Sequence, residues 1–264
     1  MFFHACYELL DQTLSTQAYK QEVAKLTPLG MRRANRFNLL AVYGALCCNA
    51  RFGVSKNTHV FVATEYGPVG SLMRVLGQMQ KGYLAPFDFL GLNTNASFYV
   101  AKALGVQGRH AMVTSHDISL EKALHLAYVD MRAGEAEAVL VGLVDETLAE
   151  VPAFERCITN VAEGCVDKSM WFYASTQPQG AKAEVVMVRE TDRQGLLEAD
   201  CFGYTQVNVT SFAAQDATLM AGLKQANKTV TTVSLARVLE QNSCLHVSQD
   251  SLGKMVVMGI KLYP

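Results

Sequence analysis

The alternation of helical and extended patterns between residues 32 and 146 is the feature that most constrains the fold. Residues 32–50 predict a helix of small and apolar residues that is nearly apolar all round from Leu39 onward, and residues 59–64 (HVFVAT) form a short apolar run typical of a buried strand. After them come a turn at 65–70, helices at 71–82 and 94–106, a strand at 108–115, a helix to about Arg132 and a strand within 134–146. Strands that alternate with helices are typical of layered α/β proteins. We therefore predict an α/β fold.

The pattern is weaker after Glu146. We predict strands at 181–188 and 196–209, a helix at 211–228 and a closing pair of strands at 244–249 and 254–262. The stretch WFYAST, which begins at Trp171, shows no regular pattern, and its side chains could be core or partner contacts. No internal repeat is evident. We expect one domain, 1–264, with an N-terminal half at about 1–150 and a reduced C-terminal half at 151–264.

Composition excludes several classes of protein. Half of the 264 residues are hydrophobic, so the chain can bury a large core. The formal net charge is −1 and no Lys/Arg run exceeds the pair Arg32-Arg33, which argues against nucleic-acid or membrane partners. The N-terminus has no secretory pattern and no 18-residue apolar stretch is present, so we expect a cytoplasmic protein.

The seven cysteines point to reduced thiols rather than to a disulfide framework or a metal site. Their number is odd, and neither a CxxC pair nor a Cys/His cluster at zinc spacing occurs. Cys157 or Cys165 as a nucleophile is disfavoured, because neither stands at a sharp turn or beside a base. No cofactor and no metal are predicted. His110 and His125 fit a strand and a helix face better than a ligand set.

The sequence VTSHDISLEKAL, residues 113–124, predicts a strand that runs directly into a helix. Many α/β enzymes place a nucleophile at such a junction. Here the residue at the tip is His116.

Residues 28–146 resemble the N-terminal half of a β-ketoacyl synthase. The matching segments are Met31–Phe37, Ala85–Phe89, Asn95–Ala96, Leu104–Gly108, Thr114–Leu120 and Met131–Glu137, the last leading to Val141–Gly142. The resemblance implies a thiolase-like layered fold, α/β/α/β/α, with a complete N-terminal half and a shortened C-terminal half.

The resemblance places His116 at the position of the nucleophilic cysteine. An acylated imidazole is labile and is a poor holding site for a growing chain, and a helix N-terminus disfavours the imidazolium. Asp117 fits a helix cap or first-turn acid better than a triad partner. The family also needs two polar residues, usually His/His or His/Asn, from the C-terminal half, whereas His246 is the sole histidine after His125. We therefore expect no catalytic residues.

Ketosynthase-like chains without the nucleophile include the chain-length-factor subunits of type II polyketide and aryl-polyene systems. The resemblance thus implies a heterodimer with a catalytic ketosynthase during polyketide, polyene or fatty-acid-like chain elongation, with an acyl carrier protein acting through that partner. In that family the strand that matches residues 109–114 pairs across the dimer axis. The implied interface residues are Asn95, Arg109, His110, Met112 and Thr114. The implied acyl-pocket residues are Phe87, Phe89, Phe98 and Tyr99, for which ordinary core packing is the alternative.

Three further alternatives stay open at this point. The chain could act alone as an acyl-thioester decarboxylase or acyltransferase that uses His116 as base or acyl acceptor. Asp145-Glu146, at the end of a buried strand, could be structural or catalytic. A basic patch of Arg32, Arg33 and Arg36 could dock an acidic carrier or be a solvated face.

Overall fold

The computed structural model describes residues 1–9, 14–86, 95–147, 167–241 and 243–263. The strands in these ranges are β1 (Phe2–Leu9), β2 (His59–Thr64), β3 (His110–Thr114), β4 (Ala138–Asp145), β5 (Lys168–Ser175), β6 (Ala183–Thr191), β7 (Gln206–Val209), β8 (Thr229–Thr231), β9 (Cys244–Gln249) and β10 (Met255–Leu262). The helices are α1 (Thr16–Leu26), α2 (Arg36–Phe52), α3 (Val69–Gln80), α5 (Ala96–Leu104), α6 (Ser119–Arg132), α8 (Arg193–Glu198), α9 (Ala217–Gln225) and α10 (Leu235–Gln241), with short 3-10 turns η1 (His116–Ile118), η2 (Asp200–Gly203) and η3 (Ala213–Gln215). The predicted α/β class is confirmed.

The strands follow the order β3-β2-β4-β5-β1-β6-β10-β9-β7-β8. Only Phe2 and Phe3 of β1 pair with β6, so the order divides there into two groups of five. The strands of each group can be numbered from one to five in chain order. Read from the outer edge inward, both groups then have the order third, second, fourth, fifth, first, and both have the same sequence of parallel and antiparallel pairings. The structure therefore contains a repeated unit. The change of group, between Ser175 and Ala183, comes later in the chain than the predicted division near residue 150.

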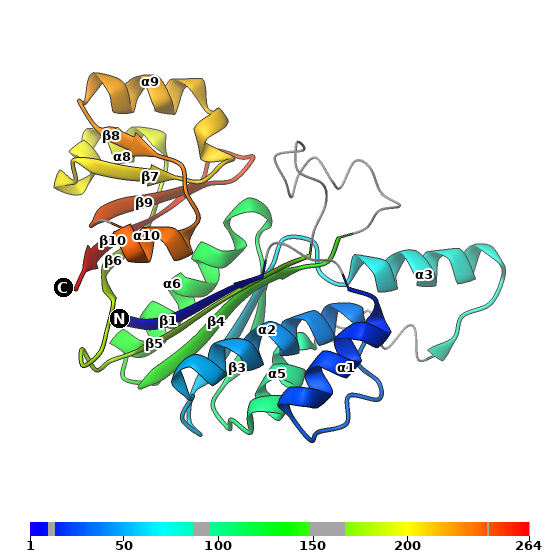
Figure 1. Cartoon of the computed structure of the whole chain (residues 1–264). Helices are drawn as coiled ribbons and strands as arrows, with labels where there is room; N and C mark the ends of the chain where they lie inside the picture. Colours follow the sequence, from blue (N-terminus) through cyan, green and yellow to red (C-terminus); the bar gives the residue numbers. More distant parts are fainter. Residues whose placement is uncertain (10–13, 87–94, 148–166, 242, 264) are drawn as a thin grey trace.

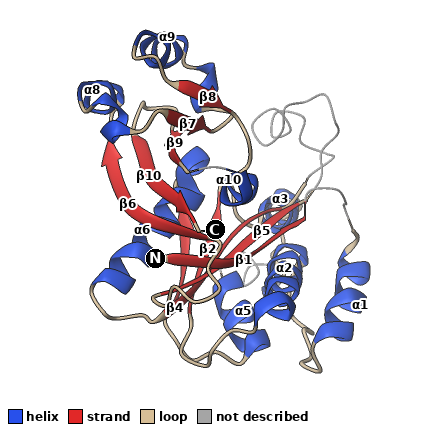
Figure 2. Ribbon diagram, turned by 60° about the vertical axis from the view of Figure 1, so that its left-hand side comes forward, coloured by secondary structure: helices blue, strands red, loops and turns tan. Residues whose placement is uncertain are grey.

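The helices and strands form layers (Figures 1 and 2), and three hydrophobic cores lie between these layers. The first lies between α1, α2 and α5 and one face of the first strand group. The second holds α6 and α10 between the two strand groups. The third lies between the second strand group and α8 and α9. Helices, strands, helices, strands and helices thus follow one another in the five-layer arrangement that we expected.

The longest helix in the described ranges, α2, shows how the sequence builds these layers. The Asn35 side chain caps its start by accepting a hydrogen bond from the Asn38 backbone N at 2.8 Å. Gly44 leaves room for Trp171, because a Cβ there would lie 2.6 Å from the indole Nε1. Gly142 of β4 makes the same allowance, with a Cβ only 2.5 Å from the ring. The two glycines allow the indole to lie between α2 and the sheet.

Two predictions in the C-terminal half need correction. Trp171, in the stretch that showed no regular pattern, lies fully buried in the central strand β5. The predicted strand 196–209 is wrong over its first part, where α8 and η2 form, and correct over β7. Asp192 starts α8 by accepting a hydrogen bond from the Gly195 backbone N at 2.8 Å. Positive φ at Asp200, Cys201 and Phe202 then prevents an extended chain.

The second strand group is complete, so the reduction of the C-terminal half lies in its helices. Helices α8, α9 and α10 have 6, 9 and 7 residues, against 17 and 14 in α2 and α6. The predicted helix 211–228 is correspondingly shorter, since η3 occupies its start. Among the described residues, no helix is long and apolar enough to cross a bilayer.

Candidate functional site

The turn between β3 and α6 carries His116 at its tip. His116 has a φ of 46°, in the left-handed region that residues other than glycine rarely adopt. Ser119 holds the turn, because its Oγ accepts from the Ser115 backbone N at 2.8 Å and donates to the His116 carbonyl at 2.7 Å. The His116 side chain is exposed. The backbone of the junction is therefore strained and is held in place by the two hydrogen bonds of Ser119, as at sites where a side chain is positioned for function.

Asp117, the next residue in the chain, interacts electrostatically with the imidazole of His116. Within the described ranges, no side chain makes a hydrogen bond with this ring. Asp117 is half-buried in the first turn of η1, one of its two predicted roles, and its side chain caps neither η1 nor α6. Burial raises the pKa of the Asp117 carboxyl above its ordinary value. Nucleophiles and general bases are commonly activated by a hydrogen-bonded partner, and in the part of the chain that the structure describes no side chain supplies one to His116.

His246 is held in a buried polar network between the two halves. On β9, its Nε2 lies 3.0 Å from Glu121 Oε1 of α6, and its Nδ1 lies 2.9 Å from Asn208 Nδ2 of β7. The Asn208 Oδ1 accepts from the Val233 backbone N at 3.0 Å, which fixes the orientation of the amide. Its Nδ2 can then only donate to His246, so Nδ1 accepts and Nε2–H donates to Glu121. His246 is a structural link with both ring nitrogens occupied.

A buried cluster of charges lies where β2 and β4 end and β5 begins. Asp145 Oδ1 accepts from Thr64 Oγ1 at 2.8 Å and from the Glu65 backbone N at 3.0 Å. Lys168 Nζ lies 3.6 Å from Glu65 Oε1. Burial, and then the Glu65 carboxylate, raise the pKa of Asp145 to about 7. Burial opposes the charge of Lys168, but Glu65, Asp145 and Glu121 outweigh it and raise the pKa of its ammonium.

The contacts of this cluster favour the structural alternative for Asp145. Its carboxyl also lies 3.3 Å from the Tyr66 backbone N, so it ties the turn after β2 to the end of β4. Glu65 and Asp145 are both at least nine-tenths buried. A substrate approaching His116 from solvent would therefore not contact either carboxyl directly.

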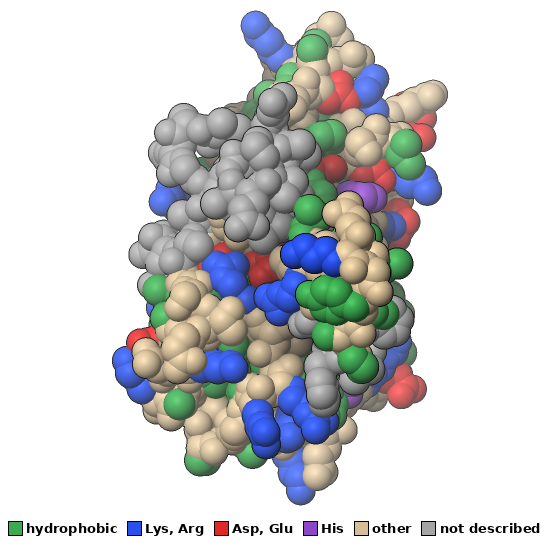
Figure 3. All heavy atoms as spheres, turned by 90° about the vertical axis from the view of Figure 1, so that its right-hand side faces the viewer, with side chains coloured by type: hydrophobic (Ala, Val, Ile, Leu, Met, Phe, Trp, Pro, Cys, Tyr) green, Lys and Arg blue, Asp and Glu red, His purple; other side chains and the backbone are tan. Residues whose placement is uncertain are grey.

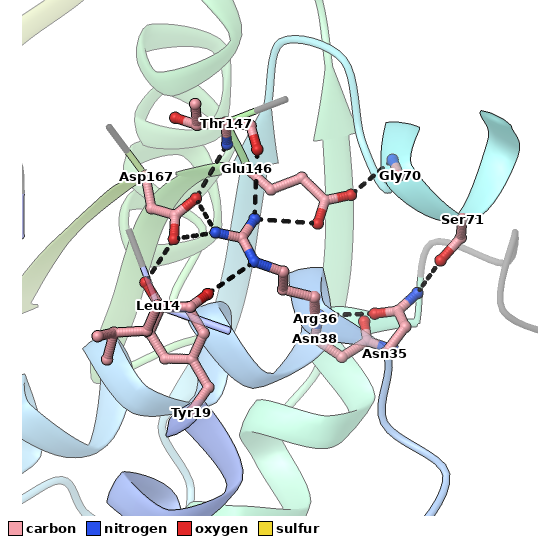
Figure 4. Close-up of polar contacts among 10 residues, drawn as sticks. All are labelled: Leu14, Tyr19, Asn35, Arg36, Asn38, Gly70, Ser71, Glu146, Thr147 and Asp167. Carbon is pink, nitrogen blue, oxygen red and sulfur yellow. Dashed lines mark hydrogen bonds and ion pairs between the residues drawn. The ribbon is translucent and has the colours of Figure 1, made fainter. Parts of the chain in front are cut away.

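Arg36 lies inside a second polar cluster rather than on a free basic surface (Figure 4). Its guanidinium contacts Asp167, with Nη2 2.7 Å from Oδ1, and its Nε donates to the Leu14 carbonyl at 2.9 Å. Glu146 lies 3.5 Å from Nη1 and accepts from the Gly70 backbone N at 2.8 Å. These contacts favour the structural alternative for Glu146 as well. The proposed patch of three arginines is wrong in its third member, and Arg32 and Arg33 remain exposed.

Strand β3 is an edge strand of the described sheet and holds three of the five predicted interface residues, His110, Met112 and Thr114. Among the described strands it pairs with β2 alone, and its residues are exposed or half-buried. Arg109, just before it, lies 3.2 Å from Asp130 of α6, and His110 Nδ1 lies 3.2 Å from Ser97 Oγ. Asn95 is placed at the start of α5, where its Oδ1 accepts from Asn38 Nδ2 at 3.0 Å. These residues lie along one edge of the molecule.

The predicted acyl-pocket residues differ in their surroundings. Phe87 and Phe89 lie outside the described residues. Phe98 is 48% exposed, so ordinary core packing does not account for it, and its ring lies 6.2 Å from the His110 ring. Tyr99 is half-buried against the first of the three hydrophobic cores, and its ring packs edge-on against the Phe98 ring. Phe98 therefore faces the same open edge as β3.

Sequence reasoning missed the charged residues that flank the central strands. Glu65 follows the apolar run of β2 directly, and Lys168 directly precedes the apolar run of β5. A charge adjoining a buried strand is a signal for a paired, buried ion, because an isolated one is costly. That signal was usable for Glu65. It was hidden for Lys168, because β5 was not predicted.

Comparisons with known proteins find similarity in structure alone. No family model and no curated protein matches the sequence. The solved ishigamide ketosynthase/chain length factor matches with a TM-score of 0.70 and 16% identity, over 100% of this chain and 99% of that one. The ketosynthase ApeO in complex with its chain length factor ApeC, from Xenorhabdus doucetiae, matches with a TM-score of 0.56 and 13% identity, over 98% and 99%.

A third match is a type II polyketide synthase acyl-carrier protein in complex with its ketosynthase, AntDE:AntF. It has a TM-score of 0.70 and 9% identity, over 99% of both chains. The structural neighbours are thus ketosynthase and chain-length-factor proteins. The chain has their thiolase-like fold, as the sequence motifs predicted.

Proposed function

We propose that the chain is a non-catalytic, chain-length-factor-like subunit. It pairs with an active β-ketoacyl synthase and shapes the pocket in which a carrier-bound polyketide, polyene or fatty-acid-like chain grows. The observation that carries the proposal is the β3–α6 junction. It has the strained turn suited to a nucleophile, but the residue there is His116, whose ring has no hydrogen-bonded side chain among the described residues. The binding of His246 to Glu121 and Asn208 supports it further, because this residue is not free to assist a condensation.

The open edge of β3 is the surface that we assign to the ketosynthase. The Val60 backbone N donates to the Arg109 carbonyl, and Val60 pairs with His110 in a parallel register. In a parallel ladder alternate residues direct both backbone groups to one neighbour. His110, Met112 and Thr114 therefore direct their N–H and C=O groups away from β2. Such an edge can bind an incoming strand through its main chain.

A proline substitution tests this surface without disturbing the sheet. Met112→Pro removes an N–H at the open edge, where proline is tolerated, and should abolish the complex with a cysteine-bearing ketosynthase in light scattering. The matched control is Val230→Pro on β8, at the opposite end of the strand order. The Thr229 backbone N donates to Thr205, so Val230 directs its own N–H outward. Complex formation unchanged by Met112→Pro would exclude β3 as the interface.

A second experiment tests the absence of catalysis. Condensation by the complex should be lost when the cysteine of the ketosynthase is replaced and retained when His116 is changed to Ala. His116→Cys in the isolated chain should not create condensing activity, because the C-terminal half has His246 alone where the family needs two polar residues. Decarboxylation or acyl transfer by the isolated chain, abolished in His116→Ala, would instead establish the stand-alone enzyme.

A further inference from the structure

Two buried carboxyls, those of Glu65 and Asp145, each have one oxygen without a hydrogen-bond donor. Glu65 follows β2 and Asp145 ends β4, and the two residues adjoin each other, because Asp145 Oδ1 accepts from the Glu65 backbone N. Their relative exposures are 9% and 1%. Within the described part of the chain, Oε2 of Glu65 and Oδ2 of Asp145 have no hydrogen-bond partner. A buried carboxylate oxygen without a donor is costly, so these two atoms indicate that the site takes a further ligand.

Three other titratable side chains act on this pair: Lys168 of β5, Asp117 of η1 and Glu121 of α6. Lys168 Nζ lies 3.6 Å from Glu65 Oε1, and its ammonium attracts Asp145 as well. Asp117 and Glu121 add negative charge near Glu65, and Glu121 is itself hydrogen-bonded to His246. In the described part of this cluster, carboxyls therefore outnumber ammonium groups.

A proton fits the two unpartnered oxygens better than a metal ion does. Among the described residues, no group of three or more His, Cys, Asp or Glu side chains could hold a metal. The Lys168 ammonium would also repel a cation placed beside Glu65. When two carboxyls share a buried site, one of them keeps its proton more readily, because two negative charges there repel each other. Burial raises the pKa of Glu65 as well as that of Asp145, which favours the protonated form.

The turn between β2 and α3 is held by the same pair. Asp145 Oδ1 accepts from the backbone N of Glu65 and of Tyr66. It also accepts from Thr64 Oγ1, which in turn accepts from the Gly67 backbone N at 2.7 Å. The turn leads into α3 on the side of the molecule that Figure 3 shows, where acidic side chains near the middle of the view lie behind Lys and Arg side chains. A displacement of Asp145 would therefore loosen the turn over residues 64–67.

We propose that Glu65 and Asp145 hold one proton between them, and that its release to solvent loosens the turn from Thr64 to Gly67. With the proton bound, the pair carries one negative charge, which the Lys168 ammonium balances. Without the proton, two carboxylates face that ammonium in a buried site and repel each other. The proton is bound at mildly acidic pH and is lost as pH rises above neutral, so the turn is tightest at the lower pH. This proton site needs no partner and goes beyond the proposed function.

The first test follows the Asp and Glu carboxyls of the full chain by carbon-13 NMR between about pH 4 and about pH 9. One carboxyl should titrate near neutrality, and Asp145→Asn should remove that titration. Glu65→Gln removes the competing charge and leaves Lys168 to Asp145 alone, so the titration should move down by about one pH unit or more. The matched control is Asp130→Asn, which changes a buried acid of α6 that pairs with His59 and should leave the titration in place.

Hydrogen exchange of the unmodified chain is a second test that needs no variant to fold. After correction for the intrinsic exchange rate, the backbone N–H groups of Glu65, Tyr66 and Gly67 should exchange about tenfold faster at about pH 8.5 than at about pH 6. The control is the Gly53 backbone N–H, which donates to the Asn49 carbonyl at 2.7 Å and has no titratable acceptor. Its corrected exchange rate should not change.

Four results would overturn the proton site. The first is that no carboxyl titrates near neutrality. The second is an unchanged titration in Glu65→Gln, which would mean that burial of Asp145 alone sets it. The third is exchange of the turn that does not depend on pH. The fourth is a titration abolished by K⁺ or Mg²⁺ at constant ionic strength, which would assign the site to a cation. None of these measurements involves a ketosynthase, so the proton site and the proposed heterodimer are tested separately.

Discussion

Nε2 of His246 lies 3.0 Å from Oε1 of Glu121, and this contact joins β9 of the second strand group to α6 of the first. Both side chains are buried. The link also reaches β7 through Asn208. One imidazole thus connects three elements drawn from both halves of the chain.

His246→Ala should destabilise the protein by about 3 kcal/mol or more, because Glu121 and Asn208 are left buried without their partner. His125→Ala is the matched control. That ring also pairs with a carboxylate, Glu190 at 3.3 Å, but the pair is on the surface, so the expected loss is within about 0.5 kcal/mol. Urea unfolding followed by circular dichroism measures both values. Equal losses in the two variants would contradict the role given to His246.

Asp145 should make stability fall as pH rises. Its folded pKa is raised to about 7 while its unfolded pKa is ordinary, so the folded state binds the proton more tightly. The stabilisation is complete below the unfolded pKa of about 4 and is lost as pH rises toward 7. Asp145→Asn should flatten the decrease between pH 5 and 7.5 in urea midpoints, on the order of a few kcal/mol at most. An unchanged slope in this variant would show that other groups cause the decrease.

Gly142→Ala should cost about 3 kcal/mol or more, because the new methyl group would lie 2.5 Å from the Trp171 ring. Gly77→Ala in α3 is the matched control. No atom lies within 4 Å of its Cβ position, so the replacement should stabilise the helix by up to about 1 kcal/mol. Trp171 is the single tryptophan, so its fluorescence reports the packing directly. A native emission spectrum and full stability in Gly142→Ala would refute this account of the Trp171 site.

His116→Gly should be more stable than His116→Val by about 1–2 kcal/mol, because glycine adopts a φ of 46° without strain and a β-branched residue does not. Thermal unfolding of the two variants provides the comparison. The same pair of changes at His110, in an extended strand, should reverse the order, because valine favours strands and glycine does not. Glycine and valine of equal stability at position 116 would mean that the turn relaxes.

The elements between residues 32 and 146 were predictable because they carry their own signals, whereas β1 and α1 were not predicted. Asn35 caps α2, Gly105 ends α5, and the apolar runs of β2 and β4 stand between helices. The sharp turn at His116 followed from the strand-helix junction. The local sequence there does not show that the imidazole lacks a partner, because side chains from other segments decide this.

The misses arise where distant contacts determine the conformation. β5 lies between β4 and β1, so every residue of it after Lys168 is buried, and its apolar run has no alternation to identify a strand. The residues with left-handed backbone, Asp200, Cys201 and Phe202, include no glycine, and Gly203 only follows them. Their residue types therefore did not predict this conformation. The side of α3 that faces the protein is set by hydrogen bonds of Ser71 with Asn35 and of Gln78 with Ala85. Its periodicity showed an amphipathic helix but not which side is buried.

The pairing of β1 with β5 sets a condition on synthesis. Phe2 lies opposite Ser175, so β1 pairs fully with β5 only after synthesis has reached Ser175. Until then β1, an apolar strand that lies between β5 and β6 in the finished sheet, lacks its partner strand β5. Contacts of such high sequence separation slow folding and expose the nascent chain to aggregation. Yield should therefore depend on translation speed and chaperone supply more than on the stability of the finished fold.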